Sequence, residues 1–202
     1  MEQSIRNHNA ATNLAKSLAG ERRFSGDLNS LASNGAIRVV GHTHFVKKDI
    51  SSLGGRNKIL DENTKKVDGV STISDNKLPK NEAFIFDTVA IAHGVGSASK
   101  MGDVKFETAF PAALQNAVLS IKQLGNVIME RPVSDFYAKA DPQSPGEKVL
   151  NLGSPHVLRD DEAIDFEITF PSGTSMADAA SAGNELLAEF KLIGYVTRRS
   201  SN

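Results

Sequence analysis

Residues 118–136, VLSIKQLGNVIMERPVSDF, decide the fold class, because they place two short apolar runs on either side of a turn. The runs, residues 118–121 and 127–129, are rich in the β-branched side chains that strands favour. Between them, Leu124-Gly125-Asn126 supplies a glycine and an asparagine, which both accept the left-handed backbone of a tight reversal. The segment therefore predicts an antiparallel hairpin. Pro132 lacks an N–H donor, which favours a strand end or an edge strand.

Further strand candidates lie on both sides of this hairpin. Residues 104–110 and 163–170 alternate apolar and polar side chains, as half-buried strands do. The other candidates are residues 36–48, 83–93, 149–152 and 185–197, the last with a first half that also fits a helix. About eight short strands with little helix predict an all-β fold, an antiparallel β-sandwich of jelly-roll type. A closed barrel is the structural alternative, because strand order cannot be read from one sequence.

The strand at residues 83–93, AFIFDTVAIAH, is apolar on both faces. Strict alternation places Phe84, Phe86 and Ala90 on one face and Ile85, Val89 and Ile91 on the other. A strand with two apolar faces is expected at the centre of a sheet that is covered on both sides.

The regions outside the strands divide the chain into an arm and one domain. Residues 4–19 carry apolar side chains at helical spacing, so residues 1–35 are expected to form a short N-terminal helical arm. The apolar stripe is thin, and the arm either docks lightly on its own domain or reaches a neighbouring subunit. The jelly-roll domain takes up residues 36–202, with a long polar loop at about 49–82 and a short helical turn at 176–182.

Composition narrows the classes of function. The chain has 202 residues, with 23 basic and 24 acidic side chains, so nucleic acid is not expected as its main partner. Cysteine is absent, which excludes disulfides, thiolate zinc sites and a cysteine nucleophile. No apolar run is long enough for a signal peptide or a membrane span, so a soluble protein made in the cytoplasm is expected. Ten phenylalanines against two tyrosines and no tryptophan indicate aromatic side chains that fill a core.

Two clusters of side chains contain residue types that bind metal ions. His42 and His44 are two residues apart on a predicted strand, so their side chains point to the same face and supply two metal ligands. No third ligand follows at a short spacing. Asp160-Asp161-Glu162 offers the oxygen ligands that calcium prefers, but without a loop of regularly alternating ligands it is better explained as a charged turn. We therefore expect no metal and no cofactor.

Residues 173–177, GTSMA, are similar to the nucleophile motif of subtilisin-like serine proteases. The resemblance implies Ser175 as nucleophile, His93 as base and Asp87 as the residue that orients it. That family is an α/β fold with a longer chain, and its Asp and His lie on separate elements. Here Asp87 and His93 are six residues apart, a span of about 20 Å on an extended strand. We therefore expect no catalytic residues and no enzyme.

Five segments together resemble jelly-roll virion proteins of bacteriophages. They are residues 81–96 (NEAFIFDTVAIAHGVG), 119–136 (the hairpin), 152–155 (LGSP), 161–176 (DEAIDFEITFPSGTSM) and 189–199 (EFKLIGYVTRR). The resemblance implies a capsid protein, made in the host cytoplasm and located in the virion, that packs with copies of itself and other virion proteins. It implies no small-molecule substrate. The alternatives are a carbohydrate- or receptor-binding β-sandwich module and an enzyme on a β scaffold that uses His42, His44 or His93.

Overall fold

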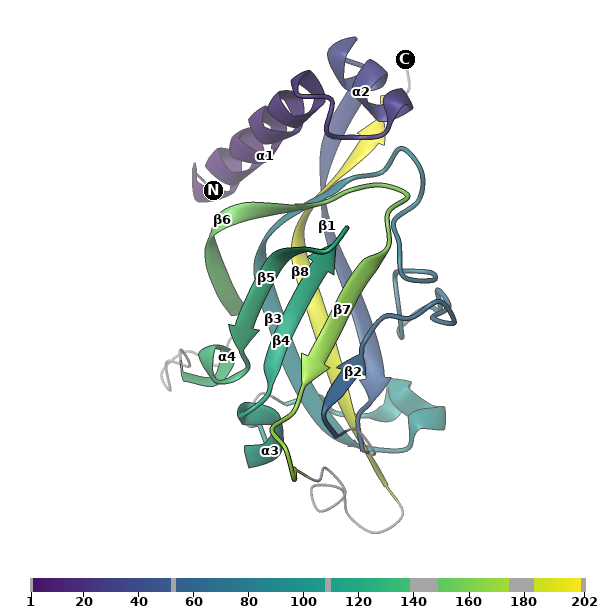
Figure 1. Cartoon of the computed structure of the whole chain (residues 1–202), viewed down its shortest axis with the longest axis vertical. Helices are drawn as coiled ribbons and strands as arrows, with labels where there is room; N and C mark the ends of the chain where they lie inside the picture. The colour runs from purple at the N-terminus through teal and green to yellow at the C-terminus, as the bar shows by residue number, and fades with distance from the viewer. Residues whose placement is uncertain (1, 52–53, 108–109, 139–148, 175–183, 201–202) are drawn as a thin grey trace.

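The computed structural model describes residues 2–51, 54–107, 110–138, 149–174 and 184–200. Within these ranges the strands are β1 (Ile37–Asp49), β2 (Arg56–Lys58), β3 (Phe84–Gly96), β4 (Val118–Gln123), β5 (Asn126–Pro132), β6 (Val149–Leu158), β7 (Ile164–Thr169) and β8 (Glu185–Arg199). They form two four-stranded sheets, in the orders β1-β8-β3-β6 and β2-β7-β4-β5. The two sheets lie face to face, and both helices of the N-terminal region sit at one end (Figure 1).

The strand pairing identifies the fold as a jelly roll. β1 pairs with β8, β2 with β7, β3 with β6 and β4 with β5, all antiparallel. The eight strands are thus the two halves of one long antiparallel ribbon, folded over so that successive pairs alternate between the sheets. This is the double-sheet arrangement predicted from the alternating sequence pattern. The predicted β-sandwich of jelly-roll type is confirmed.

The core lies between the sheets and is built from large apolar side chains. Phe84 and Phe86 stack with their ring centroids 5.9 Å apart, and Phe166 meets Phe190 edge-on at 5.7 Å. All four are fully buried in one continuous cluster that draws on both sheets. Burying such a side chain contributes about 1.5–3 kcal/mol, so this shared cluster is what holds the two sheets together.

A bulge in β3 corrects one sequence prediction. The register shifts between Phe86 and Thr88 against both neighbouring strands. Against β8, Phe86 pairs with Gly194 and Thr88 with Ile193, which leaves Asp87 as an extra residue. An extra residue reverses the facing of every side chain after it. Val89 and Ile91 therefore lie in the core cluster on the same side as Phe86, whereas strict alternation placed them on the opposite face. β3 is central in its sheet, as predicted.

The hairpin at residues 118–136 forms as β4 and β5, with a tighter turn than expected. Gln123 pairs with Asn126, so the loop has two residues, Leu124 and Gly125, in place of the three predicted. Their φ angles are +52° and +75°, the combination that a type I′ turn requires. β5 is the edge strand of its sheet and ends at Pro132, as the missing N–H of proline predicted.

The N-terminal region holds two helices where the sequence predicted one. α1 (Glu2–Gly20) contains the predicted helix. α2 (Gly26–Ser33) was not predicted, and its first turn is capped by Ser25, whose hydroxyl accepts from the backbone N–H of Leu28. Leu28 is fully buried in a small cluster with Phe24, Ala19, Ala32 and Ala83. The other helical segments in the described ranges are short: η1 (Ala98–Asp103), α3 (Ala112–Gln115) and α4 (Ser134–Ala138).

α1 covers part of the outer face of the β1-β8-β3-β6 sheet. Ala11 and Ala15 are buried against Ile85, which the alternation of β3 turns away from the core. On the same face His8 meets the ring of Tyr195 edge-on at 5.7 Å. β3 is therefore covered on both faces, which agrees with its two apolar faces in the sequence.

Two segments depart from their sequence predictions. In the described part of the polar stretch 49–82, five of the isolated apolar residues are buried in the main core: Ile50, Ile59, Leu60, Ile73 and Leu78. The stretch also contains β2, which the sequence did not predict. The expected strand at 104–110 is wrong in its described part, because residues 104–107 make one isolated bridge, Glu107 with His93. The expected helical turn at 176–182 lies outside the described residues.

Candidate functional site

The two histidines of β1 lie side by side, as their spacing predicted. The ring centroids of His42 and His44 are 4.5 Å apart at an interplanar angle of 80°. They face the inside of the sandwich, where His44 also meets Phe84 edge-on at 4.6 Å. His44 is 4% exposed, whereas His42 is half-buried and lies nearer to solvent. The pair therefore sits at one open end of the core.

A segment of the long loop covers the free edge of β1 and holds His44. The backbone N–H of Thr72 donates to the carbonyl of Phe45 at 3.0 Å, and the N–H of Phe45 donates to Thr72 Oγ1 at 2.9 Å. The same hydroxyl lies 3.2 Å from Nδ1 of His44. Ser71 forms a bridge with Val46 in the same register. The loop thus acts as a partial ninth strand that protects an edge.

A cavity of about 450 Å³ opens between this loop, β1 and the end of β8. Its walls come from parts of the chain far apart in sequence: His42, His44, Lys66, Thr72, Ile73, Ser74, Asp75, Lys77, Leu78, Pro79, Lys80, Glu82, Asp161 and Arg198. Ile73 and Leu78 are anchored in the core, which bends the loop over the histidines. A volume of this size is in the range of small-molecule sites.

Some of the basic side chains that line the cavity form ion pairs, and others do not. Lys77 lies 3.5 Å from Asp161, and Lys80 lies 3.1 Å from Asp27 outside the cavity. Among the described residues, Lys66 and Arg198 have no carboxylate within ion-pair distance. Two cations with uncommitted hydrogen-bond donors therefore remain in the wall.

The pKa values of His42 and His44 reflect the positive charges in the cavity wall. Burial, together with smaller contributions from His42, Arg198 and Lys66, lowers the pKa of His44 to about 3. Burial also lowers the pKa of His42, where the charges of Arg198 and Lys66 add to the effect and Glu82 opposes it. Both imidazoles are therefore neutral at pH 7, and the cavity around them is electropositive.

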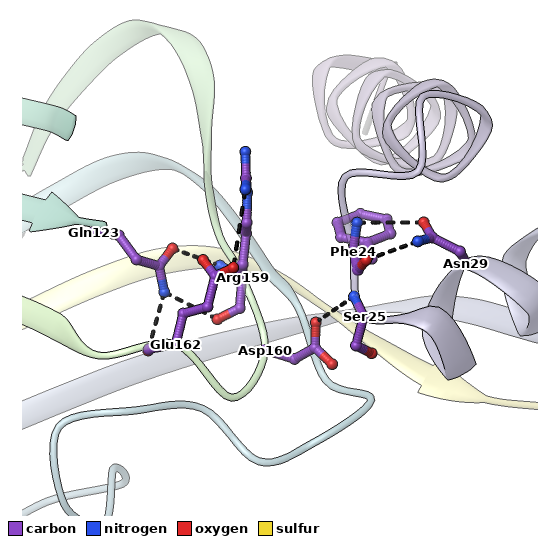
Figure 2. A network of polar contacts seen from close by, with 7 residues as sticks. All are labelled: Phe24, Ser25, Asn29, Gln123, Arg159, Asp160 and Glu162. Atoms are coloured by element: carbon purple, nitrogen blue, oxygen red, sulfur yellow. Dashed lines mark hydrogen bonds and ion pairs between the residues drawn. The ribbon is translucent and has the colours of Figure 1, made fainter. Parts of the chain in front are cut away.

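The acidic turn predicted at residues 160–162 is structural. Asp160 is 3% exposed, and its two carboxylate oxygens accept from the backbone N–H groups of Ser25 at 3.2 Å and Asn81 at 2.9 Å. Figure 2 shows Asp160 pointing at the segment that leads into α2, where Asn29 bonds to both backbone groups of Phe24. One carboxylate thus ties the N-terminal region and the cavity loop to the β6–β7 turn.

The rest of the turn is held by Gln123 at the end of β4. Its amide donates to the carbonyls of Arg159 at 3.1 Å and Glu162 at 3.2 Å and accepts from the N–H of Arg159 at 2.8 Å (Figure 2). Burial raises the pKa of Glu162, and Arg159 partly offsets the rise. Among the described residues, no three His, Asp or Glu side chains gather as a metal site would need.

The residues of the protease-like motif fall in different places. Asp87 is the bulged residue of β3, and its carboxylate accepts from the hydroxyl of Thr88. His93 lies near the other end of β3, where its ring meets Phe110 and its backbone bonds to Glu107 in both directions. Burial lowers the pKa of His93. Ser175 lies outside the described residues.

Sequence reasoning found the histidine pair and missed the cations beside it. In the sequence, Lys66 stands beside Lys65 in a polar stretch, and Arg198 stands beside Arg199 before the polar last residues. Neither carries a local signal, because each comes to the cavity from a different segment: Arg198 from the last residues of β8 and Lys66 from the loop.

Comparison of the chain with protein-family models and with curated proteins finds no match. Among the described residues, no helix combines the length and the apolar character that crossing a membrane requires.

Proposed function

We propose that this chain is a structural capsid protein of a bacteriophage that packs with copies of itself and with other virion proteins. The jelly-roll strand order supports the proposal, together with the five segments that resemble virion proteins of this type. Because one fold hosts many functions, surface features that a lone chain does not need bear more directly on function than the fold does.

The observation that carries the proposal is the tip of the β4–β5 hairpin. Leu124 is 63% exposed and has a φ of +52°, a conformation that suits glycine or asparagine and costs leucine roughly 1–2 kcal/mol. Val127, on the other side of the turn, is 56% exposed. Among the described residues, neither packing nor backbone geometry requires an apolar pair at this turn. Burial of the tip against another subunit accounts for it.

The N-terminal region provides a second surface for neighbours. Of the α1 side chains that the structure describes, Ala11, Ala15 and Ala19 are buried and the others are exposed or half-buried. Small alanines bury little apolar area, so α1 is held lightly, while Asp160 holds the segment before α2 firmly. A lightly held helix on a fixed base is suited to contact an adjacent subunit.

The variant Leu124→Asn is expected to change folding stability and self-association in opposite directions. Asparagine accepts the left-handed backbone, so the free energy of unfolding is expected to rise by about 1 kcal/mol. Loss of the apolar tip is expected to weaken self-association by roughly tenfold or more. Urea unfolding measures the first effect, and sedimentation over a range of protein concentrations measures the second.

Val67→Asn is the matched control, because Val67 is 48% exposed but lies on the long loop. It is expected to leave association unchanged. A wild-type chain that stays monomeric at every concentration and never enters phage particles would overturn the proposed function. In that event, glycan-array binding by the monomer would favour the carbohydrate-binding alternative.

A further inference from the structure

We propose that the cavity between β1, the end of β8 and the long loop binds a small oxyanion, a phosphate or a carboxylate group, through Arg198, Lys66 and the buried ring of His44. This inference is independent of capsid assembly. It depends on three features of the cavity: its uncommitted cations, its net field and a buried imidazole at its floor.

The cations supply the chemistry that recognises oxyanions. Arg198 presents a planar fork of N–H donors that matches two oxygens of a phosphate or carboxylate, and Lys66 adds a mobile point charge. Both line the cavity without a carboxylate partner among the described residues. They belong to separate segments, so the cavity alone brings their charges together.

The acidic side chains of the wall do not cancel this charge. Asp161 is engaged by Lys77, which leaves Asp75 and Glu82. Glu82 raises the pKa of His42, but Arg198 and Lys66 both lower it. At His44, every contributing charge lowers the pKa. The floor of the cavity therefore lies in a positive field that an anion would relieve.

His44 adds a polar group at the floor that has no partner. It is 4% exposed, and its Nε2 makes no hydrogen bond within the described part of the chain. Thr72 Oγ1 can donate to Nδ1 or accept from it, so the ring can carry its proton on Nε2 without losing that contact. An unsatisfied buried donor is costly, and a negative charge bound above it favours this tautomer.

The experiment is isothermal titration of the full-length chain with inorganic phosphate at low ionic strength, and separately with N-acetylglutamate as a carboxylate probe. Arg198→Ala and Lys66→Ala are expected to weaken binding roughly tenfold or more each, the usual effect of losing a charge-assisted hydrogen bond. Arg199→Ala and Lys65→Ala are matched controls, because these neighbours do not line the cavity. They are expected to change affinity less than about twofold.

A second readout follows the imidazole of His42 by NMR. The bound anion counters the field of Arg198 and Lys66, so the midpoint of the His42 titration is expected to move to higher pH on addition of phosphate. The same addition to Arg198→Ala is expected to move it less.

The two probes distinguish the sources of the oxyanion. Tighter phosphate binding assigns a phosphate ligand, and tighter N-acetylglutamate binding assigns a carboxylate ligand. The absence of both a binding heat and a shift of the His42 resonances with either probe up to about 10 mM would overturn the proposal. Equal weakening in all four variants would overturn it too, because it would show general attraction to surface charge.

Discussion

Asp160 and Asp161 are adjacent carboxylates with opposite surroundings. Asp160 is buried and accepts two backbone N–H bonds, from the segment before α2 and from the cavity loop. Asp161 is exposed and lies 3.5 Å from Lys77, whose side chain is 49% exposed. In the sequence both residues belong to one charged turn. Only their tertiary contacts show that Asp160 anchors two other segments, whereas Asp161 is a surface charge.

Asp160→Ala is expected to lower the free energy of unfolding by about 1–3 kcal/mol, because it leaves two half-buried backbone N–H groups without their acceptor. Asp161→Ala, the control, is expected to stay within about 0.5 kcal/mol, since exposed ion pairs contribute little. Urea unfolding followed by circular dichroism measures both. Similar losses for the two variants would contradict the anchoring role of Asp160.

At the scale of elements, the bulge of β3 depends on its contact with β8. Gly194 pairs with Phe86 where the bulge begins, and an added Cβ would overlap the carbonyl oxygen of Ile85 and lie 2.6 Å from Cα of Phe86. The obstacles are backbone atoms, which cannot rotate away. A side chain at this position is therefore incompatible with the pairing of the two central strands.

Gly194→Ala is expected to lower the free energy of unfolding by about 3 kcal/mol or more, because the strands must separate to admit the methyl group. Gly41→Ala is the matched control in the same sheet, since a Cβ there meets no heavy atom within 4 Å. That variant is expected to be neutral or slightly stabilising. Equal stability of the two variants, measured by thermal unfolding, would show that the close approach is not a constraint.

At the scale of the whole molecule, burial of histidines makes stability depend on pH. Burial is the main cause of the lowered pKa of His42, His44, His93 and His156. The folded chain thus keeps these rings neutral at pH values where the unfolded chain takes up protons. Their contribution is fully present above the unfolded pKa of about 6.5 and is lost as pH falls toward the folded pKa.

For His44, whose pKa is lowered to about 3, the loss between pH 6.5 and pH 4 is expected to be about 3 kcal/mol. His44→Gln is therefore expected to flatten the fall in unfolding free energy with pH, whatever its effect at pH 7. His8→Gln serves as control, because His8 is exposed on α1. Parallel pH profiles for wild type and His44→Gln would contradict the burial of a neutral imidazole.

The strands of the two sheets could largely be predicted from the sequence, because alternation along a strand is a local consequence of backbone geometry. The hairpin at 118–136, the central strand at 83–93 and the adjacency of His42 and His44 all depend on neighbours a few residues apart. The short β2 and α2 could not be found this way, since three and eight residues carry too little periodicity.

Tertiary packing alone decided the remainder. The segment 104–110 alternates like a strand, but it forms no ladder in its described part, where Val104 packs over Gly94 and Gly96. The bulge at Asp87 reverses the facing of β3 by one residue that no local rule marks. Burial of Ile73 and Leu78 folds the loop over β1 and brings Lys66 to Arg198. Periodicity is a property of one strand, whereas a cavity depends on which distant segments share a core.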